Sequence, residues 1–296
     1  MHSLTHFLGP MHVCLHVDEI VRPIACELVS SQGGATAVAL ACCCQNFEDP
    51  GLDSLWETQH RLTPLLKTFL EDIWDEGECI VSARASYIVP SLNYFIRKYF
   101  RRLPATQELA RFRKYARRMQ MFRDIGSLGG LSSEAFLVLQ RFSFDEPLLP
   151  NLKTLELLSI TADFAPFIPL FVSAGITHIS ILFPTHGLSK ASVASVITIF
   201  SARCRNLQYI GLLRLPRDPM ITDAVSELLL TTNRNTLRIL NVDSPLTEEA
   251  REVVHKLPNL RCLTAVTERG ISLPSLTLPS LTKLIVRHDH DYNWLV

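Results

Sequence analysis

The sequence predicts an α/β chain in which an N-terminal module of three helices and a helical connector precede an irregular solenoid of parallel strands. Three observations predict this order. Apolar residues recur at helical spacing in residues 1–60, a charged helical pattern continues through residues 61–118, and apolar triplets return every 21 to 31 residues within residues 119–296. With 296 residues, 47% of them apolar and 20% charged, the chain is long enough for more than one folded unit.

The first segment has the pattern of three short helices. Asp18 is the predicted N-cap of the first, and the apolar residues after it recur every four positions from Ile20 to Leu28. A pair of glycines then breaks the chain, and residues 35–47 are almost all small or apolar, as expected of a helix buried on most sides. A proline–glycine turn leads to a third apolar stripe, which ends at Trp56.

The connector, residues 61–118, separates charge along the chain. Residues 71–78 hold five acids and no base, whereas residues 97–123 hold ten bases and one acid. We expect helices interrupted at Pro90 and Pro104, with the bases on the solvated side of an amphipathic helix and paired with the acidic run. A polyanion contact through the basic run is the alternative. The whole chain has 29 basic and 29 acidic side chains, which argues against general capture of nucleic acid.

From residue 149 onward the chain repeats an apolar-x-x-apolar-x-apolar triplet whose last two members alternate as one face of a strand does. The triplets start 24, 31, 30, 23 and 21 residues apart, and such periods suit leucine-rich repeats. Helical patterns with predicted caps at Ser189, Thr222 and Thr247 lie between them, so neighbouring strands should be parallel. The six triplets are Leu152, Leu155, Leu157; Ile176, Ile179, Ile181; Leu207, Ile210, Leu212; Leu237, Leu240, Val242; Leu260, Leu263, Ala265; and Leu281, Leu284, Val286.

Polar positions between the apolar members are the candidates for substrate recognition, because they line one face of the sheet in such a solenoid. Their charges have both signs and do not indicate a ligand. No triplet is followed by the asparagine or cysteine of a regular repeat, so we expect uneven turns. Only ten residues follow the last triplet, too few for a capping helix, and we expect a truncated product or an end shielded by another chain. The candidates are Lys153, Glu156, His178, Gln208, Tyr209, Arg238, Asn241, Arg261 and Lys283.

Catalytic and metal-binding patterns are not evident. The eight cysteines lack C-x-x-C spacing and three are consecutive at 42–44, so we expect reduced thiols, those at 42–44 in a core, and an intracellular protein, cytoplasmic or nuclear. The sequence has no G-x-S-x-G, P-loop, H-E-x-x-H or dinucleotide motif, and residues 288–291 suit an exposed turn better than a metal site. We expect no enzyme, cofactor or metal. Residues 164–189 carry no charge, but three prolines argue against a membrane span.

The first sixty residues resemble an F-box, and with the repeats and the RFRKYARRM segment at 111–119 they resemble the large fungal family of F-box and leucine-rich-repeat proteins. Two positions depart from the family pattern: His16-Val17 stands where Leu-Pro is common, and Pro23 lies inside the first helix. The residues that carry the resemblance are Leu15 to Ile20, Ile24, Leu28, Ala39 to Cys42, Phe47, Asp49-Pro50, Leu52, Leu55 and Trp56.

The resemblance implies the substrate-recognition adaptor of a Skp1-cullin-F-box ubiquitin ligase: the F-box docks on a Skp1-like adaptor protein and the repeats bind a protein substrate. A segment of about 45 residues this rich in apolar side chains has more apolar surface than it can bury alone, which agrees with a partner helix covering the excess. The alternative is a stand-alone repeat scaffold whose degenerate F-box recruits no ligase. The residues implied to face the adaptor are Leu15, Val17, Ile20, Ile24, Leu28, Leu40, Phe47, Leu55 and Trp56.

Overall fold

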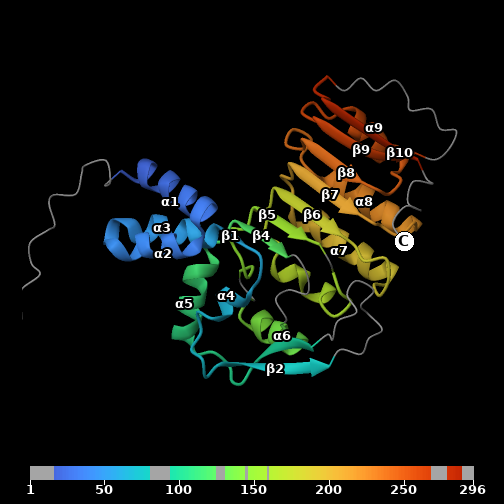
Figure 1. Cartoon of the computed structure of the whole chain (residues 1–296). Helices are drawn as coiled ribbons and strands as arrows, with labels where there is room; N and C mark the ends of the chain where they lie inside the picture. Colours follow the sequence, from blue (N-terminus) through green and yellow to red (C-terminus); the bar gives the residue numbers. More distant parts are fainter. Residues whose placement is uncertain are drawn as a thin grey trace, which may run out of the picture. The chain divides into compact units, whose positions relative to one another are not determined.

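The structure, a computed structural model, describes residues 17–80, 94–124, 131–143, 146–158, 160–267 and 279–288 (Figure 1). The chain divides into two compact units, Met1–Thr58 and Gln59–Val296. The boundary lies close to the predicted end of the first segment. The predicted connector belongs to the same unit as the strands that follow it.

The described residues of the first unit form three α-helices, as predicted: α1 (Asp18–Gln32), α2 (Gly34–Cys43) and α3 (Gln45–Glu57). The N-cap of α1 is Val17 and not Asp18, and no side chain caps this helix. Asp18 lies in the first turn, where the helix dipole favours a carboxylate, and accepts a hydrogen bond of 3.2 Å from Arg22 Nε. The helix continues through Pro23 and stops at Gly33, whose φ of 81° glycine adopts without strain.

Small side chains on α2 allow α3 to approach it closely. A Cβ built on Gly51 of α3 would lie 2.9 Å from Cβ of Ala41 and 3.2 Å from the carbonyl oxygen of Ala37, so a larger residue would separate the helices. Cys42 and Cys43 are exposed, so the prediction that residues 42–44 belong to a core is wrong: α2 turns Ala37 and Ala41 toward α3 instead. Among the residues of this unit that the structure describes, the buried apolar side chains are Val21, Ala25, Ala37, Phe47, Pro50 and Trp56.

The connector is helical only in part, which corrects the prediction. After α4 (Thr63–Leu66), the strands β2 (Trp74–Ile80) and β3 (Tyr94–Phe100) form a two-stranded antiparallel sheet, and α5 (Thr106–Ala116) follows. The sequence of β3, YFIRKYF, is mostly aromatic and β-branched, and such residues favour strands. The amphipathic helix predicted after Pro104 is α5. Pro90 lies outside the described residues.

The acidic and basic runs of the connector meet through the two arginines just before α5. Asp72 Oδ2 lies 2.9 Å from Arg102 Nη2, and Asp75 Oδ2 lies 2.5 Å from Arg101 Nη2. Arg102 also lies 2.8 Å from Glu108, whose carboxylate accepts a backbone N–H at the start of α5. Hydrogen bonds from Arg102 and from that N–H lower the pKa of Glu108. Two acids of the acidic run are therefore neutralised by arginines of the same chain.

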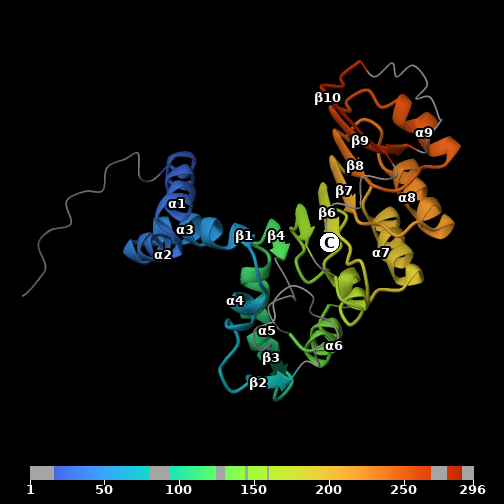
Figure 2. The ribbon, with the colours of Figure 1, turned by 45° about the vertical axis from the view of Figure 1, so that its right-hand side comes forward.

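The rest of the second unit is built on an eight-stranded sheet with the strand order β1-β4-β5-β6-β7-β8-β9-β10. The six neighbouring pairs from β4 to β10 are parallel, as predicted. Three helices alternate with the strands from β6 to β9 and lie along one face of the sheet (Figures 1 and 2). The strands are β1 (Thr58–Gln59), β4 (Met121–Asp124), β5 (Thr154–Leu157), β6 (His178–Leu182), β7 (Tyr209–Leu213), β8 (Ile239–Val242), β9 (Cys262–Thr267) and β10 (Lys283–His288). The helices are α6 (Ser133–Arg141), the 3-10 helix η4 (Ala165–Leu170), α7 (Lys190–Arg203), α8 (Pro219–Thr231) and α9 (Glu248–His255).

Two of the three helix caps predicted between the strands are present. Ser189 caps α7 and Thr247 caps α9, and each side chain accepts the backbone N–H three residues later, at 3.1 and 3.3 Å. Asp218, not Thr222, caps α8, and Pro219 occupies the first helical position, where its missing N–H removes no helical bond. This helix therefore begins before the predicted cap.

One backbone contact recurs at every step of the parallel sheet. The carbonyl oxygen of the residue just before a strand accepts two N–H groups from the start of the next strand along, at 2.7 to 3.1 Å. Lys153, for example, accepts the N–H groups of Thr177 and His178. The contact involves only the strand starts, so the register is the same in all six pairs although the repeats differ in length. The six acceptors are Gln120, Lys153, Thr177, Gln208, Arg238 and Arg261.

A carboxylate supports the turn after β7, where a regular repeat would use an asparagine. Asp243 follows β8, is 7% exposed, and accepts the backbone N–H groups of Arg214 and Leu215. Arg214 has a φ of 59°, in the left-handed region that residues with a Cβ seldom adopt. The carboxylate therefore stabilises a strained turn between neighbouring repeats.

Replacement of Asp243 tests this role. Asp243→Ala should lower the free energy of unfolding by about 1–3 kcal/mol, because two N–H groups of a strained turn lose their acceptor. Urea denaturation followed by circular dichroism measures the change. Asp223→Ala removes an exposed carboxylate from α8 and should change the free energy of unfolding by less than about 0.5 kcal/mol. Equal losses in the two variants would contradict the assigned role.

Candidate functional site

The face of the sheet opposite α7, α8 and α9, which we call the open face, carries the residues predicted to contact a substrate. On the other face Leu155, Ile179 and Ile210 point toward the helices and are fully buried. The open face consists of the residue just before each strand from β4 to β10 and the first and third residues of that strand. Of the nine candidates, Lys153, Arg238, Arg261 and Lys283 are exposed, and Glu156, His178, Gln208, Tyr209 and Asn241 are half-buried.

The strand register brings candidates from different repeats side by side. His178 and Tyr209 are direct partners, and Lys283 lies in the same row across the sheet. Glu156 and Asn241 belong to a second row, one pleat further along the strands. The candidates just before the strands, Lys153, Gln208, Arg238 and Arg261, form a third row, which the recurring carbonyl contact aligns. Neighbouring strands are about 4.8 Å apart, so side chains in one row can share a ligand.

Glu156 forms a two-point ion pair with Arg123, a residue of β4 that the sequence analysis did not include. Arg123 Nε lies 2.5 Å from Glu156 Oε2, and Nη2 lies 3.2 Å from Oε1. Hydrogen bonding to this carboxylate raises the pKa of the Arg123 guanidinium. The only acidic candidate of the open face is therefore already neutralised by its own chain.

Strand β4 escaped the sequence search because its triplet is not entirely apolar. The triplet reads Met119, Phe122, Asp124, and all three residues are fully buried. An aspartate in the third position hides the pattern from a search for apolar residues. The first two members, Met119 and Phe122, have the usual spacing of three residues. They precede Leu152 by slightly more than the longest repeat, and this is the signal that would have revealed the strand.

His178 and Tyr209 form an aromatic platform on β6 and β7. Their ring centroids are 6.2 Å apart and the rings are inclined by 16°. A Cβ on Gly211 would lie 2.8 Å from Tyr209 Cε1 and 3.0 Å from its hydroxyl oxygen, so this glycine makes room for the tyrosine ring. Thr177 Oγ1 lies 2.8 Å from His178 Nδ1 and holds the imidazole in place. Burial lowers the pKa of His178, and this effect is larger than that of the nearby Glu156 carboxylate, which raises it.

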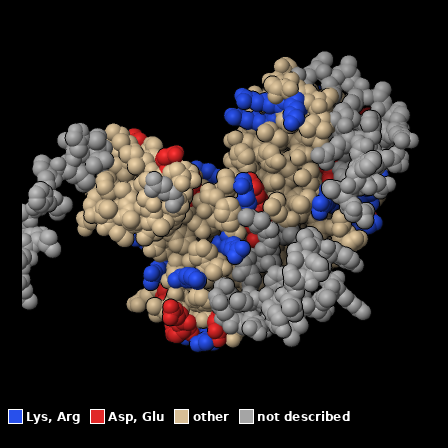
Figure 3. All heavy atoms as spheres, viewed as in Figure 1, with Lys and Arg blue, Asp and Glu red and all other residues tan. Residues whose placement is uncertain are grey.

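Basic side chains gather at the other end of the open face. Arg238, Arg261 and Lys283 are exposed, and none of the three forms an ion pair with any residue that the structure describes. Figure 3 shows Lys and Arg side chains together over the end of the sheet that β8, β9 and β10 form. This part of the open face is therefore positively charged.

In the first unit, helix α1 exposes an apolar stripe. Val17, Ile20 and Ile24 are 37%, 41% and 44% exposed, and they follow one another at spacings of three and four. Of the other residues implied to face an adaptor, Leu28, Leu40 and Leu55 are half-buried, and Phe47 and Trp56 are buried at 9% exposure. The expectation that all nine face a partner therefore fails for Phe47 and Trp56, because their rings lie in the interior. Leu15 lies outside the described residues.

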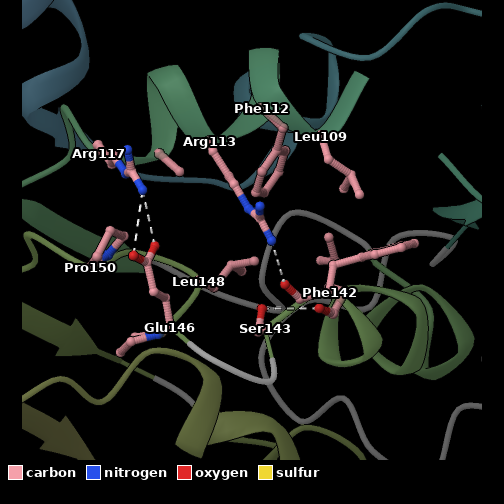
Figure 4. Close-up of a pocket in the computed structure, with 12 residues that line it drawn as sticks. Leu109, Phe112, Arg113, Arg117, Phe142, Ser143, Glu146, Leu148 and Pro150 are labelled. Atoms are coloured by element: carbon pink, nitrogen blue, oxygen red, sulfur yellow. Dashed lines mark hydrogen bonds and ion pairs between the residues drawn. The ribbon is translucent and has the colours of Figure 1, made fainter. Parts of the chain in front are cut away.

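A shallow groove lies between α5 and the segment after α6, and two arginines bridge it (Figure 4). Arg113 Nη2 donates to the carbonyl oxygen of Phe142 at 3.2 Å, and Arg117 Nη2 lies 3.3 Å from a carboxylate oxygen of Glu146. The side chains between them are mostly apolar, among them Leu109 and Phe112. Arg113 of α5 and Arg117, just after that helix, thus serve contacts within the unit, which weakens the alternative of a polyanion site here.

Within the described part of the chain, no three His, Cys, Asp or Glu side chains are grouped so that they could hold a metal ion. No helix among these residues is long and apolar enough to cross a membrane. Cys204 is buried, and burial raises the pKa of its thiol to about 12, so it is a poor nucleophile. Most of the polar run at residues 288–291 lies outside the described residues.

The titration of His178 tests the geometry of the open face. Its pKa should lie below the ordinary value of about 6.5, because burial disfavours the imidazolium. The unfolded chain then binds the proton more readily, so the full stability holds above about pH 6.5 and falls as the pH drops through the pKa of the folded state. NMR titration of the imidazole measures the value. Arg238→Gln should raise it, Glu156→Gln should lower it, and an unchanged pKa in both variants would contradict the described surroundings.

Comparison of the chain with protein-family models, with curated proteins and with solved structures finds no match to any of them. The functional argument therefore rests on the two surfaces described above, the apolar stripe of α1 and the open face of the sheet.

Proposed function

We propose that this chain is a substrate-recognition adaptor of a Skp1-cullin-F-box ubiquitin ligase. Its three N-terminal helices dock on a Skp1-like adaptor protein, and the open face of its strand repeats binds a protein substrate. The observation that carries the proposal is the apolar stripe of Val17, Ile20 and Ile24 on α1.

The apolar face of α1 is wider than the part that the first unit covers. Val21 and Ala25, at 3% and 0% exposure, face the interior of the unit, while Ile20 and Ile24, which lie beside them on the same face, remain more than 40% exposed. A helix that packs only on its own domain buries its apolar stripe against that domain. The uncovered flank of this face therefore supports docking of a partner on α1.

The chemistry of the stripe fits a partner helix. Its branched aliphatic side chains are spaced by three and four residues, the pattern by which helices anchor on one another. Burial of a complete Ile side chain contributes about 1.5–3 kcal/mol, and the exposed fraction of Ile20 and Ile24 accordingly contributes about 1 kcal/mol each. Asp18 and Arg22, which pair on the same helix, supply a polar rim beside the stripe.

The substrate arm of the proposal rests on the open face. Parallel strands present side chains from successive repeats in aligned rows, and repeat proteins use such extended surfaces to bind other proteins. On this face lie exposed polar side chains, two half-buried aromatic side chains and an ion pair. Among the described residues of the face, no titratable groups are arranged as a nucleophile and its base. Such a surface suits binding rather than catalysis.

A second candidate function is a repeat scaffold that recruits no ligase. The burial of Phe47 and Trp56 favours it, because the two aromatic rings implied to anchor an adaptor stabilise the first unit instead. On this alternative the three helices serve the fold alone, and the stripe of α1 has no adaptor partner.

Co-purification with a Skp1-like adaptor distinguishes the two functions. The unaltered chain should form a stable complex, and the double variant Ile20→Asp, Ile24→Asp should weaken it by at least about a hundredfold. Both apolar contacts are lost and two carboxylates enter an apolar interface, together about 2.7 kcal/mol or more. Isothermal titration calorimetry measures the affinity.

Leu230→Asp is the matched control, because Leu230 is an equally exposed aliphatic residue, 40%, on α8 of the second unit. It should leave adaptor binding unchanged. Circular dichroism should show the helix content of the unaltered chain in all variants, since the replaced side chains are exposed. No binding by the unaltered chain, or equal binding by the double variant, would exclude the ligase role and leave the scaffold.

A further inference from the structure

The open face has an excess of positive charge that the sequence alone does not reveal. Among the described residues it carries five basic side chains and one acidic, Glu156. Because Arg123 holds this carboxylate at 2.5 and 3.2 Å, the single acid offers no free charge to a ligand. Lys153 donates to the uncharged Gln120 Oε1 at 2.8 Å and keeps its full charge. The mixed charges of the sequence thus become a positive surface in the fold.

The free cations lie on neighbouring strands. The backbone N–H of Arg261 donates to the carbonyl of Arg238 at 2.7 Å, and that of Lys283 to the carbonyl of Arg261 at 2.9 Å. Arg238 and Arg261 therefore lie side by side in the row just before the strands, and Lys283 lies one residue further along on the next strand, with strands about 4.8 Å apart. Like charges on adjacent strands repel one another, and this repulsion is relieved when a ligand supplies negative charge.

An aromatic platform adjoins these cations. His178 and Tyr209 occupy β6 and β7, and Ile239, half-buried, is the next residue in their row. A chain that crosses the strands would pass from the stacked rings to the basic end of the face. The surface therefore offers an apolar contact and then several positive charges in sequence.

We propose that the open face binds an extended acidic segment of a protein, with its carboxylates on Arg238, Arg261 and Lys283 and an apolar side chain on the His178–Tyr209 platform. The proposal rests on the proposed function in one respect, since this segment would belong to the substrate of the ligase. The cations are spread singly over three strands, which suits successive carboxylates along a chain. A phosphate group would instead need several donors converging on one point.

A nucleic acid fits the surface less well than an acidic protein segment. Nucleic-acid affinity depends on many phosphate contacts and is usually accompanied by a large positive charge. This chain has equal numbers of basic and acidic side chains, and the three cations Arg238, Arg261 and Lys283 lie together at one end of the sheet. We therefore assign the surface to carboxylates.

Fluorescence anisotropy of the full chain with a labelled peptide tests the proposal. The peptide has about ten residues, enough to cross the strands from β4 to β10 at about 3.3 Å a residue, with glutamates in one half and a tyrosine in the other. It should bind, and its twin with Gln for every Glu should bind at least tenfold more weakly. The double variant Arg238→Glu, Arg261→Glu should lose at least tenfold in affinity for the acidic peptide, because two attractive contacts become repulsive.

Lys256→Glu is the control, because Lys256 is an exposed cation at the end of α9 and not on the open face. It should retain the affinity of the unaltered chain. Equal binding of the two peptides, or equal binding of the acidic peptide by all variants, would overturn the proposal. Tighter binding of a phosphoserine peptide without glutamate, or of a single-stranded oligonucleotide of the same charge, would overturn it in favour of phosphate recognition.

The same variants separate this inference from the ligase role. Arg238→Glu, Arg261→Glu should bind the Skp1-like adaptor as well as the unaltered chain does, and Ile20→Asp, Ile24→Asp should bind the acidic peptide normally. Loss of adaptor binding with retention of peptide binding would refute only the ligase role. If the chain binds the adaptor but binds the Glu and Gln peptides equally, only the proposal of an acidic ligand is refuted.

Discussion

A carbonyl oxygen shared by two N–H groups at the start of each strand is the contact on which the second unit depends. It uses backbone atoms alone, so the residue that supplies the oxygen can be a glutamine, a threonine, a lysine or an arginine. The sheet therefore keeps its register without constraining the side chains just before its strands. This freedom allows charged residues such as Arg238 and Arg261 to occupy a row beside the strands while their backbone aligns the next repeat.

The repeats differ in length, and the difference lies in the segments between the strands, outside the shared carbonyl contact. Repeats of different length hold helices of different length, with α7 much longer than α9. Turns are supported locally, as the Asp243 carboxylate supports the strained backbone at Arg214. Uneven repeats thus still place their strand residues in aligned rows, and the aligned rows are what make the open face a continuous surface.

Electrostatic pairing determines the character of that surface more than composition does. Glu156 would make the open face mixed in sign, but Arg123, from a strand 33 residues earlier, neutralises it. The same effect acts near α5, where Arg102 is satisfied by Asp72 and Glu108 and Arg117 by Glu146. A chain of zero formal charge can therefore carry one basic region that is free and another that is internally satisfied.

The sequence by itself determined the strands β5 to β10, the existence of α1, α2 and α3, and the alternation of inner and outer residues along β5 to β8, because apolar periodicity reflects burial directly. The prediction was wrong for Leu284 of β10, an inner member of its triplet that is 42% exposed. Prediction from the sequence failed where the local residue pattern differed from the pairing or burial that distant parts of the chain impose. The strands Trp74–Ile80 and Tyr94–Phe100 pair antiparallel where helices were predicted, and the buried Asp124 interrupts an otherwise apolar triplet. Only the tertiary structure decided which apolar side chains of the first unit face inward. Periodicity treats Ile20 and Trp56 alike, but α2 and α3 approach each other closely, and Trp56 of α3 is buried whereas Ile20 of α1 stays exposed. Only the tertiary structure, likewise, showed which charges of the open face are free, since an ion pair depends on residues that are distant in the sequence and adjacent in the sheet.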